Sequence, residues 1–233
     1  MKTLFVTGTD TAVGKTVVSR ALLQCFAQAN VCAAGFKPVA RNAQLMPEGL
    51  RNKDAVLLQH ASGLTLPYHA VNPIILEEDA ISTGSSQHVD YAQLSQGLKE
   101  LQECAARVVV EGTGGWRSLM NNRQPLSQWV QQEHLPVVLV VGIKEGCISH
   151  ALLTADAIAL DGLQLVGWVA NRINPGLAHY AEIIAVLREK LAAPLLGELP
   201  YLPRAEQREL SGYLDISLLN TVLSHDDSAK PAA

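Results

Sequence analysis

The feature that most constrains the fold is the segment GTDTAVGKT, from Gly8 to Thr16, which directly follows the apolar run 4–6. A helix is expected over 16–29, so Lys15 and Thr16 stand at its start. A strand, a glycine-containing turn and a helix in this order direct several backbone N–H groups toward one space of anion size. The segment therefore predicts a phosphate-binding loop, in which Lys15 neutralises phosphate charge and Thr16 ligates magnesium.

This loop is longer than the usual motif, because five residues separate Gly8 from Gly14. The alternative interpretation is an ordinary strand-to-helix turn with an exposed lysine. The position of the motif between an expected strand and an expected helix favours phosphate binding, since the mechanism requires that context.

Apolar runs of strand length alternate with helix-like stretches along the chain. The expected strands cover 4–7, 31–36, 108–111, 137–142, 165–171 and 195–198. This alternation indicates parallel strands, and the near-continuous valine and leucine in the central runs is typical of strands covered by helices on both faces. We predict an α/β protein with a P-loop NTPase fold, in which helices flank a mostly parallel central sheet. Ligands are expected at the carboxyl ends of its strands.

The length of 233 residues and the hydrophobic content of 48% suit a single domain, expected over 1–223, with a flexible tail over 224–233. The irregular segment 67–88 is expected to form a surface excursion that could act as a lid. The four cysteines lack CxxC spacing, which favours reduced, mostly packed thiols: Cys25, Cys32, Cys104 and Cys147.

Charge and hydropathy exclude several classes of partner. The net charge of −4 and the lack of a basic stripe argue against a nucleic-acid surface. No apolar run reaches the roughly 18 residues of a membrane span, and the first residues lack the pattern of a signal peptide. We therefore expect a cytoplasmic protein that binds no membrane.

Two further segments follow expected strands near the phosphate end. Lys37 comes after the strand 31–36, and Pro38 favours an extended backbone at this lysine. Glu111 ends the next apolar run and precedes the glycine-rich segment 112–115, so its carboxylate can reach a metal held by phosphate. The alternatives are an exposed lysine and a turn with a solvated glutamate.

Two expected helix starts carry polar groups. Asp54 lies in the first turn of a helix expected to begin at Asn52, where its other interpretation is an acid that favours the helix dipole. The segment 146–150 opens a helix expected over 151–160, and such an N-terminus can hold a carboxylate. Ser149 could also be an ordinary N-cap, which is compatible with that role.

Taken together, these segments resemble the dethiobiotin synthetase family, within the larger class of MinD/ParA-like P-loop ATPases. The likeness runs from residue 4 to about residue 213. The motifs that carry it are GTDTAVGKT from Gly8, KPVA from Lys37, PEGLRNKD from Pro47, VEGTGGW from Val110, GCI from Gly146, WVAN from Trp168 and GELP from Gly197. As an ordered set they are specific to this family.

The resemblance implies an ATP-dependent ligase that uses Mg²⁺ and belongs to biotin synthesis. Its substrates would be 7,8-diaminopelargonate and CO2, and its products dethiobiotin, ADP and phosphate. One amine captures CO2 as a carbamate, the carbamate attacks the γ-phosphate, and the second amine displaces phosphate from the mixed carbamic-phosphoric anhydride to close the ureido ring.

The same resemblance implies roles for individual residues. Lys15 and Lys37 would be catalytic, flanking carbamate and γ-phosphate. Thr16, Asp54 and Glu111 would hold the metal. The nucleotide would be bound by Ala12, Val13, Gly14, Lys15, Thr16, Val17, Asp54, Glu111, Gly112, Thr113, Gly114, Asn171, Arg172, Pro200, Tyr201, Leu202 and Glu206. The substrate would be bound by Thr11, Lys37, Arg41, Gly146, Cys147, Ile148 and Ser149. The resemblance also implies a homodimer, in which the turn 146–150 of the partner receives the substrate's distant carboxylate.

The chain departs from the family pattern at three positions. Arg41 replaces a residue that is small in many relatives, Ser149 replaces a common asparagine, and Ala12 occupies a loop position that is often acidic. The first two touch substrate selection, so a paralogue with altered substrate stays open.

Two other functions also stay open. One is a MinD/ParA-type nucleotide switch, disfavoured because Asp10 stands where those proteins carry a second lysine and because the tail lacks a basic amphipathic helix. The other is an amide-forming enzyme of the cobyrinate synthase type, disfavoured because no glutaminase domain is expected.

Overall fold

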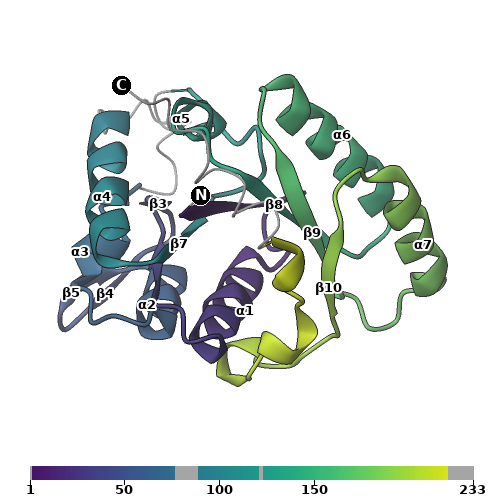
Figure 1. Cartoon of the computed structure of the whole chain (residues 1–233), viewed down its shortest axis with the longest axis horizontal. Coiled ribbons are helices and arrows are strands. Elements are labelled where there is room, and N and C mark those ends of the chain that lie inside the picture. Colours follow the sequence, from purple (N-terminus) through teal and green to yellow (C-terminus); the bar gives the residue numbers. More distant parts are fainter. Residues whose placement is uncertain (1, 77–88, 121–122, 220–233) are drawn as a thin grey trace, which may run out of the picture.

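The centre of the molecule is a six-stranded sheet in the order β10-β9-β8-β1-β7-β2, with every neighbouring pair parallel. The computed structural model describes residues 2–76, 89–120 and 123–219. Its central strands are β1 Thr3–Gly8, β2 Ala33–Phe36, β7 Arg107–Glu111, β8 Val137–Gly142, β9 Leu165–Asn171 and β10 Leu195–Leu199. The predicted α/β architecture, with a mostly parallel sheet flanked by helices, is confirmed (Figure 1).

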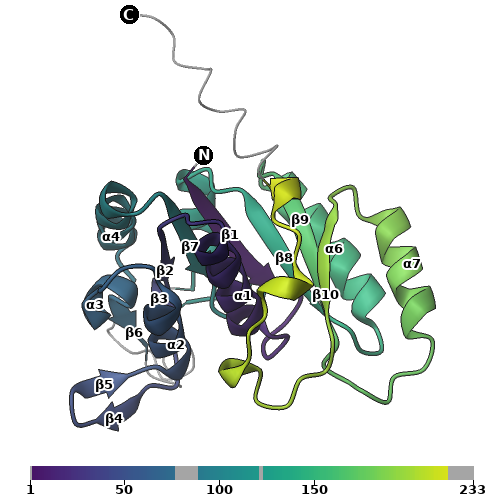
Figure 2. The ribbon, with the colours of Figure 1, turned by 60° about the horizontal axis from the view of Figure 1, so that its bottom comes forward.

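Helices connect the strands and cover the sheet. They are α1 Lys15–Gln28, α2 Lys53–Ala61, α3 Tyr68–Val71, α4 Tyr91–Cys104, α5 Ser127–Gln132, α6 Cys147–Leu160 and α7 Tyr180–Lys190. Two short 3₁₀ helices follow β10: η1 Ala205–Gln207 and η2 Ser211–Tyr213. Beside β2, the strand β3 Val39–Ala40 pairs with β6 Ile74–Ile75, and the hairpin of β4 Gln44–Met46 and β5 Gly49–Arg51 extends beyond α2 (Figure 2).

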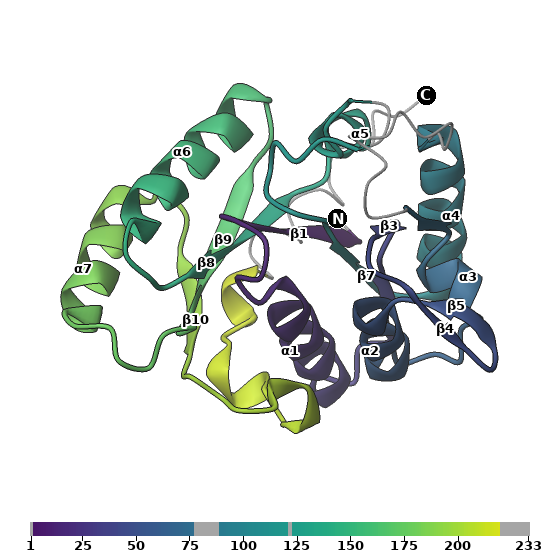
Figure 3. The same ribbon diagram turned by 180° about the vertical axis from the view of Figure 1, so that it is seen from behind.

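The sheet is buried on both faces, which explains the near-continuous apolar sequence of its strands. In β8, Val138 and Val140 join a core with residues of α1 and α2, whereas Leu139 and Val141 face the opposite way, toward α6 and α7. Residues of α4 and α5 form a further core cluster with Phe5, Val108 and Val110. Figure 3 shows α6 and α7 side by side on that face.

The observed starts of two helices can be compared with those expected from the sequence. Asn52 is the N-cap of α2, and its Oδ1 accepts a hydrogen bond from Ala55 N at 3.1 Å. The helix expected over 151–160 begins earlier, at Cys147, because Gly146 adopts a left-handed conformation (φ 77°) and serves as the N-cap. The interpretation of Ser149 as an N-cap is therefore wrong, since this residue lies within α6.

Several predictions fall partly outside the described residues. Of the excursion 67–88, the described part forms α3 and β6, and the possible lid segment 77–88 lies outside the described residues, as does the tail 224–233. The four cysteines are free, with Cys25 and Cys147 buried, Cys32 partly buried and Cys104 exposed. In the described ranges, every helix is too short or too polar to cross a membrane.

Candidate active site

The predicted phosphate loop leaves the carboxyl end of β1 and enters α1 through Gly14, whose φ of 93° lies in the left-handed region. A Cβ at Gly14 would lie 2.0 Å from Nδ2 of Asn171, so no larger residue fits. That same Nδ2 donates to the carbonyl of Val13 at 2.8 Å. Asn171, at the end of β9, therefore holds the loop against the sheet, with the N-terminus of α1 directed toward the site.

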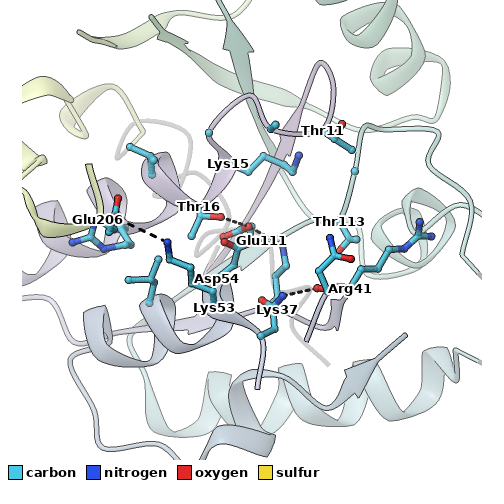
Figure 4. A pocket seen from close by; sticks show the side chains of 18 of the residues that line it. Thr11, Lys15, Thr16, Lys37, Arg41, Lys53, Asp54, Glu111, Thr113 and Glu206 are labelled. Atoms are coloured by element: carbon cyan, nitrogen blue, oxygen red, sulfur yellow. Dashed lines mark hydrogen bonds and ion pairs between the residues drawn. The ribbon is translucent and has the colours of Figure 1, made fainter. Parts of the chain in front are cut away.

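A cavity of about 440 Å³ opens at this edge of the sheet (Figure 4). It lies between the loop, the start of α2 and the segments that follow β2 and β7. Many predicted site residues line it together: Thr11, Ala12, Gly14, Lys15, Thr16, Val17, Lys37, Arg41, Asp54, Glu111, Thr113, Gly114 and Glu206. Its size is in the range of small-molecule sites.

Lys15 is almost fully buried, and its Nζ donates to the backbone carbonyl of Asp10 at 2.9 Å. Burial, aided by the nearby positive charge of Lys37, lowers the pKa of Lys15 to about 8. Among the described residues this buried ammonium has only a neutral carbonyl as its hydrogen-bond partner, so it is well suited to receive an anion.

Lys37 and Thr16 meet at one carboxylate oxygen. Oε1 of Glu111 lies 2.7 Å from Lys37 Nζ and accepts from Thr16 Oγ1 at 2.8 Å. Lys37 Nζ also donates to the Gly112 carbonyl at 3.0 Å and lies 3.9 Å from Asp54 Oδ2. Lys37 and Glu111 are 4% and 1% exposed, so this ion pair is shielded from water. Side chains from four separate segments thus meet around the Lys37–Glu111 ion pair.

The donor set fits Mg²⁺. Thr16, Asp54 and Glu111 supply hydroxyl and carboxylate oxygens, which are the ligands that Mg²⁺ prefers. Oε2 of Glu111 is buried and accepts no hydrogen bond within the described part of the chain, so it can accept a ligand. Across the described ranges, no group of three or more His, Cys, Asp and Glu side chains could hold a metal. A bound Mg²⁺ would accordingly keep phosphate and water among its ligands.

A second, smaller cavity of about 160 Å³ adjoins the first, because Val17 lines both. It brings together five of the residues expected to bind the nucleotide: Asn171, Arg172, Pro200, Tyr201 and Leu202. The guanidinium of Arg172 lies 4.9 Å from the ring centre of Tyr180, and its Nη2 donates to the carbonyl of Pro175 at 2.9 Å. Glu206 lines the first cavity instead and pairs with Lys53 at 3.9 Å (Figure 4).

The turn before α6 lies apart from both cavities within this chain. Gly146, Cys147 and Ile148 line a third cavity of about 770 Å³, and Ser149 is exposed on α6. Two other predicted residues act through their backbones: the carbonyls of Val13 and Gly112 accept bonds from Asn171 and Lys37. Neither residue lines the first two cavities.

Sequence reasoning missed several residues that line the first cavity: Arg20, Asn42, Asn52, Lys53, Leu57 and Ser118. Asn52 could have been found, because asparagine before an expected helix is a capping signal. Arg20 carries no local signal, since its Nη1 reaches the Ala205 carbonyl at 3.0 Å across the fold.

The Arg41 side chain is directed away from the rest of the site. Its Nη2 donates to the Leu119 carbonyl at 2.6 Å, and its side chain extends away from Lys37 (Figure 4). Burial lowers the pKa of Arg41, and its Nε is buried with no hydrogen-bond partner among the described residues. This cation therefore lines the cavity wall, not the cluster around Glu111.

Comparison with known proteins gives consistent matches. A family model described as an AAA domain matches residues 2–209. The chain is 64% identical over 226 residues to the ATP-dependent dethiobiotin synthetase BioD 2 of Escherichia coli K12, covering 97% of this chain and 98% of the relative. It is 58% identical over 217 residues to a protein of the same name from Yersinia pestis, covering 93% and 98%. It is 51% identical over 223 residues to ATP-dependent dethiobiotin synthetase BioD of Vibrio vulnificus, covering 94% and 98%.

Solved structures share the fold at much lower identity. A chain of the MinC:MinD cell division protein complex of Aquifex aeolicus superposes with a TM-score of 0.60 at 13% identity, covering 100% of this chain and 98% of the other. A ParA family ATPase of Chlorobium tepidum gives 0.54 at 11%, covering 96% and 93%. These likenesses establish the P-loop fold alone, whereas the sequence relatives establish the family. The chain belongs to the dethiobiotin synthetase family.

Proposed function

We propose that this protein is an ATP-dependent dethiobiotin synthetase, which joins 7,8-diaminopelargonate and CO2 and closes the ureido ring of dethiobiotin. The observation that carries the proposal is the Oε1 atom of Glu111, which Lys37 and Thr16 both contact at the mouth of the phosphate loop. This grouping of a cation with oxygens of the type that bind Mg²⁺ supports a role in binding ATP phosphates. The close relatives carry the name of this activity.

The chain's task in this reaction is alignment and charge stabilisation. A carbamate oxygen attacks the γ-phosphate, and the second amine then displaces phosphate from the mixed anhydride. Lys15 and the loop N–H groups would hold the phosphates, while Lys37 would stabilise negative charge between carbamate and γ-phosphate. Because the substrate itself supplies both nucleophiles, the protein needs no covalent intermediate.

Thr16, Asp54 and Glu111 would hold Mg²⁺, whose bound form would neutralise charge on the phosphate oxygens. The second cavity would take the adenine, with Asn171 and the segment 200–202 around the ring. Its direct contact with the first cavity through Val17 supports this arrangement, since a nucleotide must span both.

We further propose a homodimer that completes the substrate site. In one chain the turn 146–149 lies away from the phosphate cavity, so its expected carboxylate role requires another copy. The α6 N-terminus that this turn opens can hold a carboxylate. Leu153 and Leu160 of the same helix are 64% and 85% exposed, which supports burial of this helix against a partner.

A mixed dimer tests the shared site. Chains with Lys15→Ala are combined with chains carrying Ser149→Asp, whose added charge should repel the substrate carboxylate. One composite site would carry both defects and the other neither, so activity should return to about half of the parent level by site counting. Mixed dimers that are verified by mass and remain inactive would contradict the interface site.

A direct assay tests the activity. The purified protein is incubated with ATP, Mg²⁺, bicarbonate and diaminopelargonate, and dethiobiotin is sought by mass spectrometry. ADP release should require diaminopelargonate, whereas a nucleotide switch would hydrolyse ATP without it. Substrate-independent hydrolysis with no dethiobiotin would overturn the proposed function.

A specific observation favours one alternative function. Arg41 brings a half-buried cation to the cavity wall, so a paralogue that accepts a different, more acidic substrate is the second candidate. Replacing diaminopelargonate in the same assay by other diamino acids would identify such a preference. The expected cytoplasmic location stays a prediction.

A further inference from the structure

A buried polar network lies behind the active site, outside the residues assigned to ATP, metal or substrate. Its centre is the hydroxyl of Tyr68 in α3. This hydroxyl accepts from the backbone N–H of Asn52 at 2.7 Å and donates to Oδ1 of Asn72 at 2.9 Å. Asn52 and Asn72 are 5% and 3% exposed, and the Tyr68 side chain between them is partly buried.

On one side the network holds the backbone that carries Lys37. Nδ2 of Asn72 donates to the Lys37 carbonyl at 2.7 Å and to the Ile74 carbonyl at 3.0 Å. The Lys37 N–H donates to the Val71 carbonyl at 2.7 Å. Both backbone polar groups of Lys37 are thus bonded to the segment 71–74, which fixes where its side chain starts.

On the other side the network holds the start of α2 and the backbone of Arg41. Oδ1 of Asn52 caps α2, whose first turn carries Asp54, and Nδ2 of Asn52 donates to the Arg41 carbonyl at 2.6 Å. The ring of Tyr68 lies against Arg51, with the guanidinium 4.3 Å from the ring centre. Lys37, Asp54 and Arg41 all line one cavity (Figure 4).

The hydrogen-bond partners of these side chains fix which atom donates and which accepts. The two carbonyls at Asn72 require its amide nitrogen, which leaves its oxygen to accept from Tyr68. The Tyr68 hydroxyl then donates to Asn72 and can only accept from Asn52. A polar network with donor and acceptor roles fixed in this way is expected to be rigid.

We propose that Asn52, Tyr68 and Asn72 are positioning residues of the active site, and that the Tyr68 hydroxyl sets the spacing between Lys37 and Asp54. The inference rests on the proposed function, which gives Lys37 and Asp54 their roles. A small displacement of either group costs rate, since catalysis here is alignment.

The test compares two tyrosine-to-phenylalanine variants. Tyr68→Phe removes the shared hydroxyl and leaves the ring for Arg51. Tyr91→Phe removes a hydroxyl that donates to the Pro125 carbonyl at 3.1 Å, away from the cavity, and serves as the matched control. Tyr68→Phe should lower kcat for dethiobiotin about tenfold, equivalent to about 1.4 kcal/mol, whereas Tyr91→Phe keeps parental kcat.

Calorimetry adds a readout that does not depend on turnover. Tyr68→Phe should bind ATP in EDTA as the parent does, but should lose most of the gain in ATP affinity that Mg²⁺ brings, because Asp54 is displaced. Asn52→Ser keeps a neutral helix cap and loses the donor to Arg41, so it should raise KM for diaminopelargonate severalfold with kcat largely kept.

The outcomes separate this proposal from the proposed function. A parent protein that makes no dethiobiotin refutes the function, while the Mg²⁺-dependent binding of ATP still tests the network. If the parent is active and Tyr68→Phe has the same kcat and the same Mg²⁺-dependent gain in ATP affinity as the parent, the positioning role of the network is refuted. Equal losses in both tyrosine variants, in step with their melting temperatures, would also overturn it by showing a purely structural role.

Discussion

The phosphate end of the site and the turn before α6 differ in how far one chain completes them. Around Glu111, cation, hydroxyl and carboxylate are buried and bonded to one another. The turn 146–149 lies beside a separate cavity, and Ser149 is exposed. The proposed phosphate site is therefore complete within one chain, whereas the proposed site for the substrate's far end is not. Variants at the two ends should differ accordingly in size and kind of effect.

The largest effect should come from Lys15→Ala at the phosphate end. A buried phosphate would lose its main fixed positive charge, so turnover should fall by about three decades, or roughly 4 kcal/mol of transition-state stabilisation. Steady-state kinetics check this, with exposed Lys99→Ala on α4 as the control. Near-normal turnover in a folded Lys15→Ala protein would break the assignment.

Lys37→Gln should act mainly on kcat, with a loss of about a hundredfold, because this residue is assigned to charge that develops between carbamate and γ-phosphate. ATP affinity, measured by calorimetry, should change far less, and Lys99→Gln should change neither. If affinity and kcat fell in parallel, Lys37 would be a general phosphate contact instead.

The affinity for ATP should fall about tenfold for each pH unit above pH 8. The pKa of Lys15 is lowered to about 8, so the free site loses this proton as pH rises, whereas bound phosphate would favour the charged form. Binding at pH 9 should therefore take up close to one proton per site. Calorimetry in buffers of different ionisation enthalpy measures the uptake.

Lys15→Arg supplies the control for the pH experiment, since a guanidinium stays charged throughout. It should abolish the proton uptake even where ATP binds more weakly. The same uptake in both proteins would assign the titration to another group.

The smallest effect is expected at the turn before α6. Ser149→Asn restores the residue common in relatives, so KM for diaminopelargonate should fall about two- to fivefold, the size of one modest hydrogen bond. KM for ATP should stay the same. A change in both KM values would tie Ser149 to the nucleotide and erase the contrast between the two ends.

The sequence predicted the central sheet well, because its signals are local and strong. Each expected strand is present within about two residues, and parallel burial follows from the valine-rich runs. The phosphate loop and Glu111 could be proposed as site residues in the same way, since the loop follows a strand and Glu111 ends one.

Features that depend on tertiary contacts were not predictable. The Tyr68 hydroxyl joins α2 to the segment after β2 only because α3 folds between them. No local pattern in the sequence PYHAVNP predicts this contact. The early start of α6 was missed because Gly146 takes a left-handed conformation that lets the helix begin at Cys147. The motifs of the family resemblance pointed to residues 146–149, yet no periodicity could say in which chain's site they act.

The oxygen that Lys37 and Thr16 share has a thermodynamic consequence. A divalent cation bound at Oε2 of Glu111, which accepts no hydrogen bond from the described residues, would repel the Lys37 ammonium from the neighbouring Oε1, which would release the lysine toward phosphate. Metal and nucleotide are then reciprocal effectors, each raising the affinity for the other by the same factor. An ATP molecule without its metal meets a carboxylate that still retains the lysine, which makes the pair, and not either ligand alone, the species that the site selects.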